Sequence, residues 1–218
     1  MMAQISAYRD SLTQSNCYLI EEGGAVIVID PNDYTIVGKA LEEQSLTPEL
    51  VLLTHEHCDH IRGLEELRDN CPVKVMCSSR CSMGITDITK NMSRMMEVYL
   101  LYRIQKEIVY PPFTCRPADF TYDAVYSFTW RGHTFECTPL PGHSGGSSCF
   151  RMDGGSLFTG DYLIQGEQVI TRLPGGCEQE YEEKARPWLA MLEEGLMIYP
   201  GHDVNYVLTG EMKKQYGL

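Results

Sequence analysis

The stretch THEHCDH, residues 54–60, directly follows the apolar run Val51-Leu52-Leu53 and holds three of the chain's six histidines. A short apolar run of this kind is typical of a buried strand, so the polar residues stand at a strand end. Imidazole nitrogens and carboxylate oxygens are ligands that suit Zn²⁺, and also Fe and Mn. The alternative interpretation is a strand end that is polar because it reaches solvent. The density of the motif favours a metal site.

Three further apolar strands end in residues of the same kind. CTPLPGH ends at His143, SLFTGD at Asp161 and LMIYPGH at His202. The remaining histidine, His133, lies in the turn RGHTF, and we expect it to be structural. The candidate ligands are too many for one tetrahedral ion, but they suit two ions if one carboxylate bridges. They are His55, His57, Asp59, His60, His143, Asp161 and His202.

The composition limits the class of protein. The chain has 218 residues, of which 43% are hydrophobic, as expected of a globular domain. Its formal net charge of −12 argues against nucleic-acid binding, which requires cationic side chains. No apolar run approaches the length of a membrane span, and Arg9 and Asp10 interrupt the N-terminus where a signal peptide would be apolar. With nine cysteines at irregular spacings, we expect reduced thiols, a cytoplasmic location and no membrane partner.

Hydrophobic periodicity and turn residues predict strand pairs and helices that occur twice in a similar order. We therefore expect one domain, residues 1–218, with sheets inside, helices outside and a helical insert at about 81–112. The expected helices are 34–45, 61–70, a long stretch at 81–109, 178–194 with a break at Pro187, and a short tail. The expected strands are a hairpin at 16–31 and the runs 50–55, 73–78, 125–130, 133–140, 147–153, 156–161 and 196–202.

The motif H-x-H-x-D-H and the later PGH, TGD and GH, in this order, resemble the metallo-β-lactamase superfamily, and within it the glyoxalase II-like hydrolases. The resemblance runs from NCYLIE to YPGHD. It implies an α/β fold, the αββα four-layer sandwich, in which two mixed sheets are flanked by helices. It also implies a first metal held by His55, His57 and His143, a second held by Asp59, His60 and His202, and Asp161 as the bridge.

The resemblance implies a binuclear metal-dependent hydrolase, in which a hydroxide held by two divalent ions, zinc first, attacks a small thioester or ester. Asp59 would be both a ligand and the catalytic proton acceptor. Two divalent ions, two aspartates and one hydroxide leave a net charge of about +1, which favours an anionic acyl substrate.

The chain departs from glyoxalase II at two places. Sixteen residues follow His202, so the helical region with which glyoxalase II binds glutathione is not expected. The insert NMSRMMEVYLLYRIQKEI, residues 91–108, carries a Met and aromatic stripe that is either core or a lid over the metals. In the lid interpretation Met96 and Tyr99 contact substrate. Arg172 matches an arginine often found after TGD and is either a further substrate contact or an ordinary surface arginine.

Other functions remain open. A mononuclear iron persulfide dioxygenase keeps the fold but needs only the first metal, so Asp59 and His202 together disfavour it. A lactonase or a phosphodiesterase would use the same centre. An exported β-lactamase would need an export signal, and a binding protein on a decayed scaffold would have lost ligands.

Overall fold

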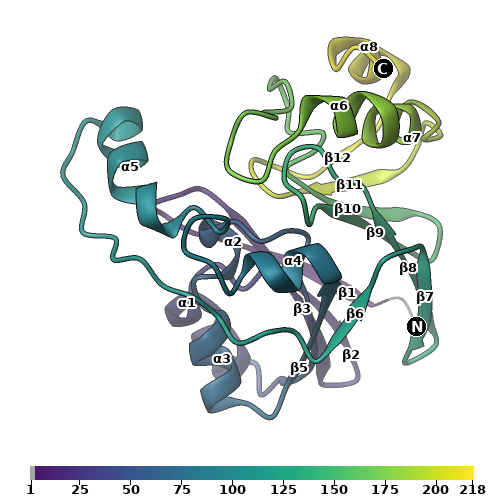
Figure 1. Ribbon diagram of the computed structural model, residues 1–218. Coiled ribbons are helices and arrows are strands. Elements are labelled where there is room, and N and C mark those ends of the chain that lie inside the picture. Colours follow the sequence, from purple (N-terminus) through teal and green to yellow (C-terminus); the bar gives the residue numbers. More distant parts are fainter. Residues whose placement is uncertain (1–2) are drawn as a thin grey trace.

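The computed structural model describes residues 3–218, which form two six-stranded sheets that face each other (Figure 1). The first sheet has the order β1-β2-β3-β4-β5-β6 and the second the order β12-β11-β10-β9-β8-β7. Both sheets mix parallel and antiparallel pairs: β3, β4, β5 and β6 run parallel, and so do β10 and β11. The strands are β1 (Gln4–Arg9), β2 (Asn16–Glu22), β3 (Ala25–Ile29), β4 (Thr47–Leu52), β5 (Lys74–Ser78), β6 (Phe120–Tyr122), β7 (Tyr126–Trp130), β8 (His133–Pro139), β9 (Ser148–Met152), β10 (Ser156–Gly160), β11 (Met197–Pro200) and β12 (Tyr206–Val207).

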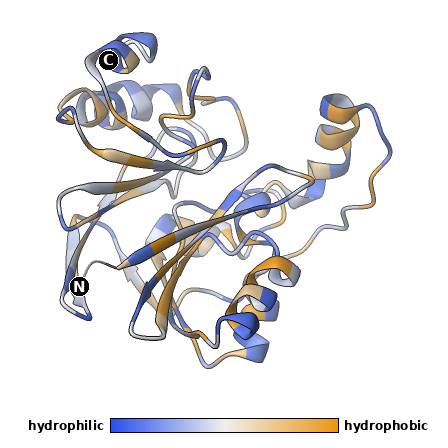
Figure 2. Cartoon of the chain, turned by 180° about the vertical axis from the view of Figure 1, so that it is seen from behind, coloured by the Kyte–Doolittle hydropathy of each residue, from blue (hydrophilic) through white to orange (hydrophobic). Residues whose placement is uncertain are grey.

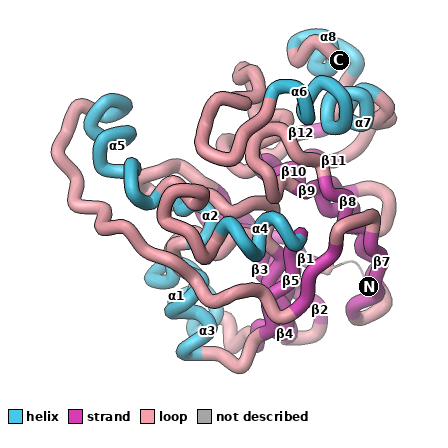
Figure 3. The backbone as a smooth tube through the Cα atoms, viewed as in Figure 1, coloured by secondary structure: helices cyan, strands magenta, loops and turns pink. Residues whose placement is uncertain are grey.

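Helices cover the outer face of each sheet, as Figures 1 and 3 show. The first sheet is covered by α1 (Tyr34–Glu43) and α3 (Leu64–Asn70), and α2 (Cys58–Ile61) and α4 (Ser79–Gly84) lie near its upper end. The second sheet is covered by α6 (Glu178–Glu180), α7 (Arg186–Ala190) and α8 (Gly210–Gln215). None of the helices within residues 3–218 is long and apolar enough to cross a membrane.

Side-chain alternation along β3 shows why the sheets lie inside. All five residues of β3 are buried. Val26 and Val28 pack against the helices of the first sheet, whereas Ile27 and Ile29 pack between the two sheets. A strand with apolar residues on both faces must be covered on both faces. The predicted αββα four-layer sandwich is confirmed, and Figure 2 shows hydrophobic residues in the strands as well as on parts of the helices.

The long helical stretch predicted over 81–109 is wrong. After α4 the chain forms turns, a 3-10 turn at Ser93–Met95, and then α5 (Met96–Ile104), which projects from the body (Figure 1). Short polar side chains explain the break, since they bond to the backbone in place of a helix. Asp87 accepts from the backbone of Thr89 and Lys90, and Asn91 accepts from the N–H of Ser93.

Two other predicted helices are shorter than expected, although the short helical tail is confirmed by α8. The 61–70 helix is split into α2 and α3, and the 178–194 helix ends at Ala190. Pro187 falls in the first turn of α7, directly after a π-helical turn at Tyr181–Ala185, which is the irregularity that a proline requires. Strands β1, β6 and β12 were not predicted.

The packing of Phe158 between the sheets gives a test of the sandwich. Its ring is fully buried, 4.8 Å from the ring centroid of Tyr199 and 5.4 Å from that of Tyr18. Phe158→Ala should lower the free energy of unfolding by about 3–5 kcal/mol because it leaves a cavity. In urea unfolding, the matched control Phe120→Ala should cost less than about 1 kcal/mol, since Phe120 is 56% exposed. Equal costs would contradict the packing described here.

Candidate metal centre

The carboxyl ends of four strands bring the candidate ligands together where the two sheets meet. His55 and His57 follow β4, and His143 follows β8. The three rings are buried, with centroids 4.7–5.0 Å apart. Each offers one nitrogen, and these nitrogens lie within 4.8 Å of one another. This first group could hold a metal ion.

A second group lies beside the first. The chain turns from His57 into α2, which carries Asp59 and His60, and His202 follows β11. The Asp59 Oδ2 atom is 3.4 Å from His202 Nε2 and 3.7 Å from His60 Nε2. These three residues also have ligand atoms within 4.8 Å of one another. Both groups expected from the sequence are therefore assembled as geometric sets.

Asp161, at the end of β10, lies between the two groups. Its Oδ1 atom is 3.2 Å from His60 Nε2 and 3.6 Å from His202 Nε2, both of the second group. Its Oδ2 atom is 3.3 Å from His143 Nε2, of the first group. Each carboxylate oxygen thus faces a different group, as a bridging ligand requires.

Backbone carbonyls fix the tautomers of two histidines in the first group. His57 Nε2 lies 3.2 Å from the Pro174 carbonyl, and His143 Nδ1 lies 2.9 Å from the Ile170 carbonyl. A carbonyl can only accept, so each of these nitrogens carries the proton. The opposite nitrogens, His57 Nδ1 and His143 Nε2, then face each other at 3.0 Å with a lone pair each. Two facing lone pairs at this distance fit a bound cation.

Asp30 fixes the tautomers of His55 and His60, directly for His60 and through Thr54 for His55. It accepts from Thr54 Oγ1 at 2.5 Å and lies 3.2 Å from His60 Nδ1. Since the hydroxyl proton of Thr54 goes to Asp30, His55 Nδ1 must donate to Thr54 Oγ1, at 3.0 Å. His55 and His60 therefore both present Nε2 to the centre. Asp30, His55 and His60 also have potential ligand atoms close to one another. The hydrogen bonds among Asp30, Thr54 and the two Nδ1 atoms already occupy this side of the histidines.

Buried atoms without partners mark the middle of the centre. Among residues 3–218, His55 Nε2, His60 Nε2 and Asp161 Oδ1 are buried and make no hydrogen bond of acceptable geometry, although the last two lie 3.2 Å apart as an ion-pair contact. Leaving such an atom unpaired costs about 1–3 kcal/mol. All three point at the space between the groups, and imidazole nitrogen with carboxylate oxygen is a donor set for divalent cations. The residues present fit the metal ions that the sequence predicts.

The electrostatics favour the ligating protonation states in the first group. Burial, with the neighbouring His143, lowers the pKa of His57 to about 4, and burial also lowers the pKa values of His55 and His143. These imidazoles are neutral at pH 7, the form that binds metal.

In the second group, the positive charge of protonated His60 takes a place that a metal cation could take instead. Burial alone would raise the pKa of Asp59, but His60 and His202 lower it to about 2. Burial alone would lower the pKa of His60, but Asp59 and Asp161 raise it well above its usual value. A divalent cation bound among these residues would displace the His60 proton.

Gly201 lets β11 pass close behind the centre. A Cβ atom at this position would lie 2.5 Å from Asp161 Oδ1 and 2.8 Å from His60 Cε1. Its backbone also ties the strand end in place, because the Asn16 N–H donates to the Gly201 carbonyl at 2.7 Å. Glycine at this position is thus required by the approach of the strand to two candidate ligands.

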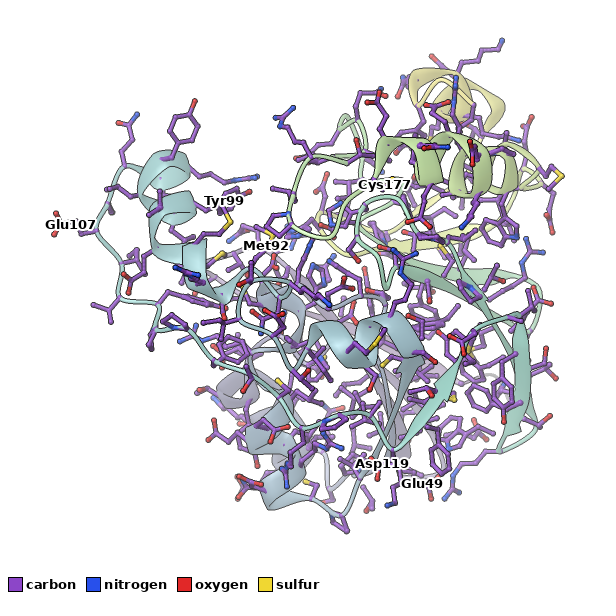
Figure 4. All side chains as sticks on the ribbon, viewed as in Figure 1. Glu49, Met92, Tyr99, Glu107, Asp119 and Cys177 are labelled. Atoms are coloured by element: carbon purple, nitrogen blue, oxygen red, sulfur yellow. The ribbon has the colours of Figure 1, made fainter. Side chains whose placement is uncertain are left out.

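A cavity of about 120 Å³ opens onto the centre. Asp59, His143, Asp161 and His202 line its floor, and Met96 and Tyr99 of α5 line one side. Figure 4 shows Met92 and Tyr99 on the side of the insert that faces the body. Arg172 is exposed and is not among the lining residues, so the structure does not bring it to the cavity.

His133, which we expected to be structural, lies outside the centre. It is buried at the start of β8, not exposed in a turn, and pairs with Asp153 at 2.6 Å. Asp30 and Arg103, which also lines the cavity, were missed as site residues. The position of Asp30 at the end of the apolar run VIVID is the signal that could have found it.

The sequence profile of the Metallo-beta-lactamase superfamily matches residues 10–202. The chain belongs to this superfamily. The match spans all seven candidate ligands, from His55 to His202.

The chain is similar in sequence to two bacterial hydrolases. The chain is 27% identical over 191 residues to a "Probable metallo-hydrolase YqgX" of Bacillus subtilis, covering 87% of this chain and 85% of that protein. It is 30% identical over 190 residues to a hydroxyacylglutathione hydrolase of Tolumonas auensis, covering 87% of this chain but 61% of that protein.

Solved structures of the superfamily share the fold. The BLEG-1 B3 metallo-beta-lactamase aligns with a TM-score of 0.77 at 24% identity, over 94% of each chain. The ETHE1 protein of Myxococcus xanthus aligns with a TM-score of 0.68 at 20% identity, over 94% of this chain and 79% of that one. At these identities the likeness shows the fold alone.

The support by Asp30 can be tested without touching a candidate ligand. Asp30→Asn should weaken metal binding by about 10–100-fold, because the acceptor that orients His60 loses its charge. Competition with a chelator measures the affinity, and circular dichroism checks that the variant is folded. Asp153→Asn, which alters a histidine–carboxylate pair away from the centre, should leave the affinity unchanged. Equal affinities in both variants would show that Asp30 does not support the centre.

Proposed function

We propose that this protein is a binuclear metal-dependent hydrolase that cleaves a small thioester or ester. The observation that carries the proposal is the position of Asp161, whose two oxygens face two different groups of candidate ligands at 3.2 and 3.3 Å. One metal would be held by His55, His57 and His143, a second by Asp59, His60 and His202, and Asp161 would bridge them.

When bound, two divalent cations would supply Lewis acidity and lower the pKa of the attacking water. The Asp59 carboxylate lines the cavity and stays ionised at neutral pH, because its pKa is about 2. It would accept the proton of the attacking water at a carboxylate oxygen. Met96 and Leu100 make that side of the cavity apolar and would exclude bulk water.

The choice of thioester or ester as substrate rests on the motifs of the glyoxalase II-like hydrolases and on the relatives called a metallo-hydrolase and a hydroxyacylglutathione hydrolase. Lactones and phosphodiesters would suit the same centre. A persulfide dioxygenase would use one iron and leave Asp59, His60 and His202 without a task, whereas all three converge in this chain. Zinc is the first candidate metal, because imidazole and carboxylate ligands suit it.

A substrate screen on protein of known metal content tests the activity. Elemental analysis after metal-replete expression should find about two divalent ions per chain. The loaded protein should hydrolyse members of a panel of acyl thioesters and esters faster than lactones or phosphodiesters. One iron per chain with oxygen uptake on a persulfide would contradict the proposal.

The bridge makes an asymmetric prediction about two variants. Asp161→Ala should lower the occupancy of both sites and abolish hydrolysis, because its oxygens face both groups. His202→Ala should lower the occupancy of one site only, since its Nε2 atom lies beside Asp59 Oδ2 of the second group, at 3.4 Å. Elemental analysis of the two variants measures the difference. Equal metal content, with Asp161→Ala still active, would show that Asp161 does not bridge.

A further inference from the structure

Arg103 is exposed and lines the cavity, where one hydrogen bond to the half-buried Tyr99 orients its side chain. It stands four residues after Tyr99 on α5, so the two side chains share one face of the helix. Arg103 Nη1 donates to the Tyr99 hydroxyl at 2.7 Å, and the guanidinium carbon lies 6.0 Å from the centre of the Tyr99 ring. Within residues 3–218, Nε and Nη2 of Arg103 make no hydrogen bond. The donors that remain match the planar geometry of a carboxylate.

The cavity extends from the Arg103 guanidinium to the candidate metal ligands, and one of its walls is apolar. Met92, Met96 and Leu100 are buried, line the cavity and pack with Leu173 of the opposite loop. Methionine side chains adapt to ligands of different shape. A ligand in the cavity therefore meets the candidate metal ligands at the floor, apolar surface along the wall, and one arginine.

We propose that Arg103, positioned by Tyr99, selects substrates that carry a carboxylate away from the reacting carbonyl. The inference rests on the proposed hydrolase function, and it names the substrate class: small carboxylate-bearing acyl thioesters or esters. The carboxylate sits either on the acyl group or on the leaving group, and both present the same anion to Arg103.

Glu167 tests whether the cavity binds anions through the positive charge of Arg103, because the Glu167 carboxylate lines the same cavity. Its negative charge acts on Arg103, whose pKa is raised first by the hydrogen bond to Tyr99 and further by Glu167. If Arg103 binds substrate, the Glu167 carboxylate repels the same anion, so Glu167→Gln should strengthen the binding of anions. If Arg103 and Glu167 instead pair to close the cavity, Glu167→Gln should have the same effect as loss of Arg103.

Binding of reaction products tests the proposal without catalysis. Succinate, glutarate and adipate each have a second carboxylate, whereas butyrate, pentanoate and hexanoate of matched length do not. Calorimetric titration of the zinc-loaded protein should show at least one dicarboxylate bound about tenfold more tightly than its matched monocarboxylate, as a charge-assisted hydrogen bond provides. Arg103→Met should remove this preference, Arg103→Lys should restore part of it, and Tyr99→Phe should reduce it by a few-fold.

Rates of hydrolysis then show whether the carboxylate that Arg103 binds lies on the acyl group or on the leaving group. One pair of substrates is the glutaryl thioester of N-acetylcysteamine and its terminal amide. The other pair is the acetyl thioester of mercaptopropionate and that of mercaptopropanamide. In the pair whose carboxylate reaches Arg103, the acid should have a kcat/KM about tenfold above that of the amide, and Arg103→Met should abolish the difference.

Arg94→Gln is the matched control, because Arg94 lies on the same insert, is exposed and does not line the cavity. It removes the same charge and should leave every preference as in the wild type. Preferences that survive Arg103→Met, or that Arg94→Gln reduces equally, would overturn the proposal. Hydrolysis of the thioesters without any acid preference would sink the inference and leave the proposed function standing. An Arg103-dependent preference for dicarboxylates without hydrolysis of any substrate would support carboxylate binding by Arg103 and contradict the proposed hydrolase function.

Discussion

The structure depends on a cluster of nitrogen and oxygen lone pairs that face one another inside the protein. Carbonyl groups at Ile170 and Pro174 force the protons of His143 and His57 outward, so two unprotonated nitrogens meet at 3.0 Å. Without a cation between them this contact is repulsive, and burial makes it more so. Asp161 Oδ1 is also buried without a hydrogen bond, 3.2 Å from His60 Nε2. Such an arrangement loses stability in exchange for a preformed site for cations.

The fold provides this site by joining the ends of strands from both sheets. β4 carries residues of the first sheet to the centre, and β8, β10 and β11 carry residues of the second. Rigid strands fix ligand geometry more precisely than mobile loops do. The insert with α5 is attached differently: its inner face packs on the cavity, while Val98 and Tyr102 on its outer face are 68% and 87% exposed. Under the proposed function, this division would leave metal binding to the sandwich and would place substrate contacts on α5.

The residues of the centre could be predicted from the sequence because each candidate ligand directly follows an apolar strand in a recognisable motif. Their division between two metals came from the resemblance, and the distances around Asp161 are consistent with it. Asp30 was missed although it ends the apolar run VIVID, since a lone aspartate after a strand is equally typical of a turn. Arg103 and Arg172 were indistinguishable in type, and only the path of the insert brings Arg103 to the cavity. The breaks at Asp87 and Asn91 depend on hydrogen bonds between side chain and backbone, which compete with the backbone hydrogen bonds of a helix. The edge strand β1 was missed because its residues are exposed or half-exposed and lack a clear alternation.

Anomalous X-ray diffraction from crystals of the zinc-loaded protein tests the central claim most directly. Data collected on both sides of the zinc absorption edge locate each ion without reference to activity. Two anomalous peaks about 3.5–4 Å apart, on either side of the Asp161 carboxylate, are the result that this account predicts. A single peak among His55, His57 and His143, with Asp59, His60 and His202 bonded only to one another at full zinc occupancy, would contradict it.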